Sequence, residues 1–180
     1  MRFSPFVSLA VALALPCSGV AQNQGLQTPW DFKKTIENLT SYSKQLNPML
    51  DQVKPAEWTN APDGYASQQQ MVKTQLRSIS ILTQNLAKEP ERLPMALDLY
   101  FRYENFDITL ASLIDGVRRY QNPAVADLIT GVRNENAPAR QALKDYVVEL
   151  AATKDEEFRV ADREAQRCRG LLLKPSRGRN

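Results

Sequence analysis

Two carboxylates three residues apart, Glu104 and Asp107, are the best candidates for chemistry in this sequence. Residues at this spacing lie on one face of a helix, where paired carboxylates can exchange protons or hold a hard cation. The chain contains no histidine, so it lacks the imidazole ligands of di-iron helix bundles. The simpler interpretation is that both carboxylates pair with Arg102 or with a basic residue on a facing helix. We therefore rank catalysis by this pair last.

Other kinds of catalytic and cofactor site also lack residues that they require. Without histidine, a serine or cysteine nucleophile has no usual base, and structural zinc lacks ligands. Covalent haem needs a Cys-x-x-Cys-His motif, which the sequence around Cys168 does not contain. The glycines are scattered singly, so there is no phosphate-binding loop. The sequence predicts a protein that is not an enzyme and uses no metal or other cofactor.

Four aromatic residues fall within seven positions, namely Tyr100, Phe101, Tyr103 and Phe106. They could line a pocket for a small apolar ligand. Such clusters more often form part of the core, with the tyrosine hydroxyls reaching its rim. Core packing is the preferred interpretation, and ligand binding stays open as the alternative.

These aromatic residues belong to the stretch 90–120, whose apolar residues recur in alternating steps of four and three. This spacing is typical of a helix that packs along one face. Because the stretch is apolar beyond one stripe, we expect it to pack on more than one side, as the central helix of a bundle.

Two helices with the same spacing are predicted before this stretch. The first begins with Thr28 as cap and Pro29 in its first turn, and Pro48 should kink it or split off its last turn. Residues 54–64 contain two prolines and an Asp-Gly pair, so they form the first connection. The second helix covers 65–88.

The last predicted helix begins at Pro123, with Asn122 as its cap, and its apolar steps continue to Leu150. Beyond Leu150 the steps run through Thr153, Glu157 and Val160 and become polar, so this end should project past its partners. Pro138 predicts a kink or a break between residues 134 and 137. Asn136 either caps the helix after that break or lies in the apolar seam.

The four helices predict an all-α fold, an antiparallel up-down-up-down four-helix bundle with a long C-terminal helix that is kinked or broken near Pro138. No strand pattern is present. The bundle should cover residues 22–166 as one domain.

Residues 1–21 have the features of a secretory signal peptide. A positive start at Arg2 precedes an apolar run over 6–15, and small residues at Gly19 and Ala21 predict cleavage after Ala21. Acylation at Cys17 is disfavoured by Pro16, which stands where a small residue is expected. No later stretch is apolar enough to span a bilayer. We expect a periplasmic or secreted protein.

Residues 167–180 form a basic tail without acidic residues, whereas all 20 acidic residues of the chain lie within 22–166. Such a tail can contact anionic lipid or an acidic partner, although a solvated, disordered terminus is the alternative. A nucleic-acid-binding protein would carry its basic face on the folded body, so nucleic acid is not expected as a partner. The basic residues are Arg167, Arg169, Lys174, Arg177 and Arg179.

Cys168 would be the one cysteine left after cleavage. It could form an intermolecular disulfide, in a homodimer or with a partner, or remain a free thiol.

These features predict an exported, non-enzymatic helical bundle that acts through surface contacts in the cell envelope, as a scaffold, adaptor or chaperone-like binder of an unknown protein partner. The alternative is a bundle that binds a small apolar ligand at its aromatic cluster. In general character the chain is similar to exported bacterial helical proteins. The Leu-Thr-x-x-Gln signature of small envelope-stress chaperones fails, because residues 82–86 read LTQNL.

Overall fold

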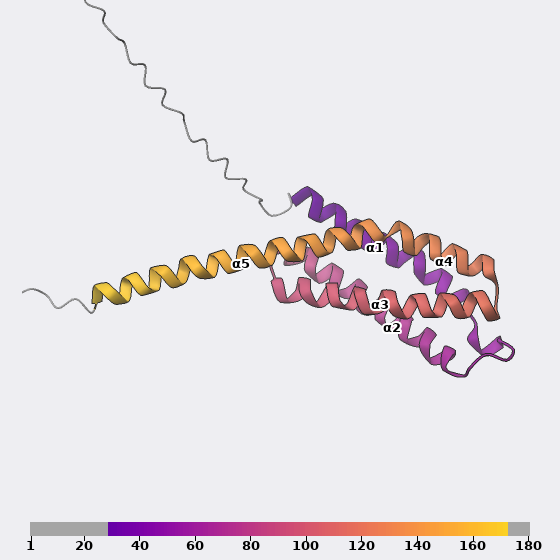
Figure 1. The fold of residues 1–180 in the computed structure, drawn as a ribbon. Helices are drawn as coiled ribbons and strands as arrows, with labels where there is room; N and C mark the ends of the chain where they lie inside the picture. Colours follow the sequence, from indigo (N-terminus) through magenta and orange to yellow (C-terminus); the bar gives the residue numbers. More distant parts are fainter. Residues whose placement is uncertain (1–28, 173–180) are drawn as a thin grey trace, which may run out of the picture.

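The structure is a computed structural model that describes residues 29–172, and these residues form helices joined by short connections (Figure 1). The predicted signal peptide, Lys174, Arg177 and Arg179 lie outside the described residues. Within residues 29–172, no helix has both the length and the apolar composition that a membrane crossing requires. The helices are α1 (Pro29–Gln52), the short 3-10 helix η1 (Pro55–Glu57), α2 (Gly64–Lys88), α3 (Leu93–Tyr120), α4 (Pro123–Glu135) and α5 (Ala137–Leu172).

The predicted four-helix bundle is confirmed, with α4 and α5 together forming its fourth member (Figure 1). The helix α3 contacts α2, α4 and α5, and α1 lies across the core from it. α3 is therefore one corner of a square and not a central helix, which corrects our expectation. Its additional apolar residues, among them Phe101 and Ile108, are exposed on the outside of the bundle.

Proline and cap residues set most of the helix boundaries. Asn122 accepts a hydrogen bond from the backbone N–H of Ala124 at 2.8 Å, and Pro123 occupies the first turn of α4, as predicted. Pro48, however, lies inside α1, which continues to Gln52. The expectation that Pro48 could split off the last turn was wrong, because Leu50 in that turn and Val53 just after it are buried in the core and hold the turn in place.

The break predicted before Pro138 is present at a single residue, Asn136. The backbone N–H of Asn136 donates to Val132 O at 3.3 Å, and the N–H of Arg140 donates to Asn136 O at 3.1 Å. These two bonds tie Asn136 to the end of α4 and to the start of α5, and the two helices meet there at a bend (Figure 1). The Asn136 side chain is buried, with 5% of its surface exposed, so this residue both ends α4 and lies in the apolar seam.

The second half of α5 leaves the bundle, as its polar sequence predicted. Residues up to Lys154 touch the bundle, and all residues from 155 to 171 are exposed. Figure 1 shows this part of α5 extending past the ends of the other helices. We call residues 155–172 the α5 extension.

Candidate functional site

A charged cluster joins three helices beside the break between α4 and α5. The carboxylate of Asp107 on α3 accepts two hydrogen bonds from Arg133 of α4, one from Nε at 2.8 Å and one from Nη2 at 2.6 Å. Arg140 of α5 adds a third contact, its Nη1 lying 2.7 Å from Asp107 Oδ1. All three side chains are largely shielded from solvent. The cluster holds two positive charges against one negative charge.

The two carboxylates singled out in the sequence do not form a joint site. Asp107 finds basic residues on facing helices, as expected, but Arg102 binds Asp98 at 2.8 Å instead. Glu104 is exposed on the surface of α3. Among residues 29–172, no group of three or more His, Cys, Asp or Glu side chains is placed to hold a metal ion.

The charged cluster is poorly suited to proton transfer near neutral pH. Burial raises the pKa of Asp107, but the hydrogen bond from Arg133 and the charge of Arg140 outweigh it, so the pKa of this carboxyl is lowered. Burial, helped by the negative charge of Asp107, raises the pKa of the Tyr42 hydroxyl. The carboxylate thus stays ionised and the phenol neutral, which suits a structural role better than acid–base catalysis.

A polar groove of about 410 Å³ lies between α1 and the α4–α5 break. Two buried donors close to it, Asn136 Nδ2 and Arg140 Nε, have no hydrogen-bond partner within the described part of the chain. Its charged residues, Lys34 and Glu135, are of opposite sign and exposed, so the groove offers no net charge that would select a ligand. Its walls are formed by Lys34, Asn38, Ser41, Tyr42, Gln45, Val132, Glu135, Asn136, Pro138 and Ala139.

The aromatic cluster of α3 is divided between the core and the surface. Tyr103 and Phe106 each have 1% of their surface exposed, and both rings pack near that of Tyr42, with centroids 6.4 and 6.3 Å away. Phe101 is 57% exposed, and the half-buried ring of Tyr100 lies 5.4 Å from it. The four rings therefore do not converge on one cavity.

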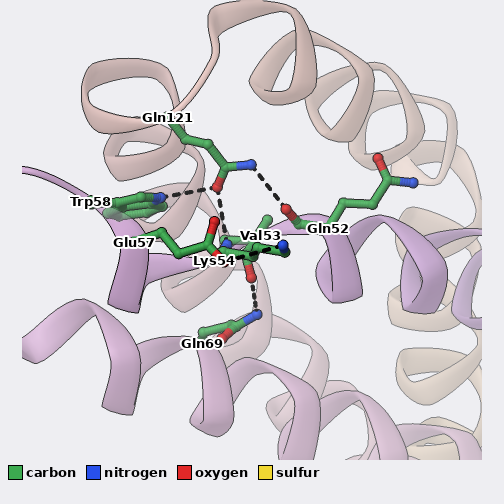
Figure 2. Close-up of polar contacts among 7 residues, drawn as sticks. All are labelled: Gln52, Val53, Lys54, Glu57, Trp58, Gln69 and Gln121. Atoms are coloured by element: carbon green, nitrogen blue, oxygen red, sulfur yellow. Dashed lines mark hydrogen bonds and ion pairs between the residues drawn. The ribbon is translucent and has the colours of Figure 1, made fainter.

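At the opposite end of the bundle from the α5 extension, one glutamine side chain joins three segments (Figure 2). Gln121, just after α3, donates to the carbonyl of Gln52 at 2.9 Å. Its Oε1 accepts from the backbone N–H of Lys54 and from Trp58 Nε1, both at 3.0 Å. Gln69 of α2 donates to the carbonyls of Leu50, at 2.8 Å, and Val53. This group could not be predicted from the sequence, because glutamine carries no positional signal comparable to that of proline or glycine.

An aromatic trio packs beside Gln121. The rings of Trp58, Tyr65 and Tyr120 lie with their centroids 5.2 to 5.9 Å apart. Gly116 makes room for this trio, because a Cβ atom there would lie 2.4 Å from Cε1 of Tyr65. The trio and the glutamines close this end of the core.

The α5 extension exposes all of its residues from 155 to 171, among them several large apolar side chains. Phe158 is 71% exposed and Leu171 63% exposed, and Val160 is also exposed. The helix runs to Leu172, so Arg167, Cys168 and Arg169 are part of it rather than of a separate tail, and Cys168 is a free, exposed cysteine.

Comparisons with protein-family models, with curated proteins and with solved structures gave no match to this chain. The proposal for function therefore depends on the geometry alone.

Proposed function

We propose that this protein is an exported, non-catalytic adaptor or scaffold of the cell envelope, and that it contacts its partner through the α5 extension. One observation carries the proposal: the helix continues from residue 155 to Leu172 with every side chain from 155 to 171 exposed. Most of the stability of a helix in a protein comes from packing of one of its faces against other elements, and within residues 29–172 the extension has no such packing. A surface that covers the α5 extension would therefore stabilise it.

The composition of the α5 extension supports a contact role. It presents Phe158, Val160 and Leu171 to solvent. Exposed apolar residues that gather on one element often mark interaction sites. Arg167 and Arg169 lie at its far end, and three more basic residues follow in the sequence. This end would suit an acidic partner or an anionic membrane surface.

Export is supported by the sequence of residues 1–21, with its positive start, apolar run and small residues before the expected cleavage site. A non-catalytic role is supported by the charged cluster, in which two arginines hold Asp107 ionised and occupy both of its oxygens. The ligand-binding alternative has no comparable support, since Tyr103 and Phe106 are committed to the core.

Truncation tests the proposal. A chain that ends at Lys154 removes the α5 extension and keeps all buried residues of the core. We expect unchanged cooperative thermal unfolding by circular dichroism, together with loss of co-sedimentation with cell envelopes. A chain that ends at Gln166 separates the basic end from the rest. Envelope association that survives in the chain ending at Lys154 would overturn the proposal.

A further inference from the structure

One face of α5 continues from the bundle core onto the α5 extension. Within the bundle, Leu143 and Val147 are buried on this face. Helical steps of three and four residues lead along the same line to Phe158, Ala161, Ala165 and Cys168. All four of these residues are exposed. The face that packs against α1 and α3 in the first half of the helix is thus uncovered in the second half.

The ion pairs made by Glu156 lie on the opposite side of the α5 extension. Glu156 binds Arg159 at 3.3 Å and Arg163 at 3.2 Å, and these positions are about half a turn from Phe158 and Ala165. This network does not cross the apolar face, whereas Glu157, at the edge of that face, pairs with Lys154 at 2.9 Å where the extension begins. Asp155 and Arg169 stand along one edge of that face, near its two ends.

We propose that two copies of this chain pair through the apolar faces of their α5 extensions in antiparallel orientation. The twofold axis crosses the pair at the height of residue 163, midway between Phe158 and Cys168. The proposal rests on the proposed function and names the partner surface. The spacing of Phe158, Ala161, Ala165 and Cys168 is the same read from either end. Phe158 then packs beside the partner's Cys168, and Ala161 beside the partner's Ala165. The small central residues let the two helices approach closely.

Charge favours the antiparallel orientation. The extension begins with Asp155, Glu156 and Glu157 and ends with Arg167 and Arg169. Antiparallel pairing places the acidic start of each copy beside the basic end of the other, and it brings Asp155 next to the partner's Arg169. Parallel pairing would place like charges together and both bundles at the same end. The two Asp162 side chains lie close together near the axis and repel each other, so the association should be modest in strength. It should weaken at high salt, because salt screens the attraction between Asp155 and the partner's Arg169.

Disulfide mapping tests the orientation, using the chain from residue 22, in which Cys168 is the one cysteine. In the antiparallel pair the two Cys168 residues are about 15 Å apart along the axis, beyond the reach of a disulfide. Phe158→Cys places a thiol beside the partner's Cys168. We expect mild oxidation to give a covalent dimer of Phe158→Cys and not of the parent chain. Ile81→Cys, at an exposed position on α2, is the control and should form no covalent dimer.

Charge exchange tests the pairing without relying on a thiol. In sedimentation equilibrium we expect dimer at high protein concentration, at least tenfold weaker pairing for Asp155→Arg, and recovery when Arg169→Asp is added. A chain that is monomeric at all concentrations, or a parent chain that oxidises through Cys168 to its own copy, would overturn the proposal. Either result leaves the proposed function standing if the Lys154 truncation still loses its envelope association.

Discussion

Asp107 on α3 binds Arg140 on α5 at 2.7 Å, just past the break between α4 and α5. The same carboxylate binds Arg133, which precedes the break. One side chain therefore holds the helices on both sides of Asn136. The junction at Pro138 is therefore fixed from α3 as well as by its own backbone.

Replacing Asp107 should destabilise the bundle. Asp107→Asn leaves two shielded guanidinium groups close together without their counter-charge, which should cost about 1–3 kcal/mol of unfolding free energy. Urea unfolding followed by circular dichroism measures it. Glu104→Gln is the matched control on the same helix, where an exposed change should stay within about 0.5 kcal/mol. Equal effects of the two substitutions would show that the charged cluster does not stabilise the fold.

The lowered pKa of Asp107 predicts how stability depends on pH. The carboxyl binds protons more weakly in the folded protein than in the unfolded chain, where its pKa is near 3.8. Its contribution is therefore fully present above this value and is lost as the pH falls through the lower folded pKa. Unfolding free energies measured from pH 6 to pH 2 should fall more steeply for the parent chain than for Asp107→Asn. Parallel curves would contradict this assignment.

Two substitutions in the aromatic cluster separate its core from its surface. Phe106→Ala removes a buried ring and should cost about 3–5 kcal/mol. Phe101→Ala, at a mostly exposed position five residues earlier, should change stability by no more than about 0.5 kcal/mol. Thermal unfolding checks both. If Phe106→Ala unfolded like the parent chain and instead lost a bound small molecule seen by native mass spectrometry, the ligand-binding alternative would gain support.

Two glycines in helices should respond in opposite directions to alanine. Gly131→Ala on α4 has open space for the new Cβ, and should stabilise the protein by about 0.5–1 kcal/mol, because alanine is the better helix former. Gly116→Ala on α3 drives the new methyl group into the ring of Tyr65, which Trp58 and Tyr120 hold in place. We expect a net loss of stability in urea unfolding. A gain at Gly116 equal to that at Gly131 would show that the trio shifts freely.

The sequence was sufficient for the fold class and for the break near Pro138, because proline and apolar spacing act locally. It was not sufficient for the partners of Asp107. Arg102, five residues before Asp107 on the same helix, is one candidate and a facing basic residue is the other, and only the register of α3 against α4 and α5 decides between them. The local effect of Pro48 predicts a kink or a separate last turn, whereas the burial of Leu50 and Val53 keeps that turn in α1.

The face of the α5 extension was missed for a related reason. A seam drawn at a fixed seven-residue period passes through Glu157 and Val160. A straight α-helix drifts by about 20° per heptad relative to that period, which is less than the roughly 100° between neighbouring residues. The line from Leu143 and Val147 to Phe158 and Ala161 therefore runs beside that seam as a second line, which a search along one seam does not find.

The bonds made by Gln121 have a consequence for the order of folding. Gln121 stands 69 residues after Gln52 and 63 after Trp58 along the chain, so the turn that follows α1 cannot complete its hydrogen bonds until α3 has docked. A nascent chain that has released only α1 and α2 would expose this turn to water and to proteases. The hairpin of the first two helices should therefore not persist as an autonomous intermediate, and the bundle should assemble cooperatively once its third helix is available.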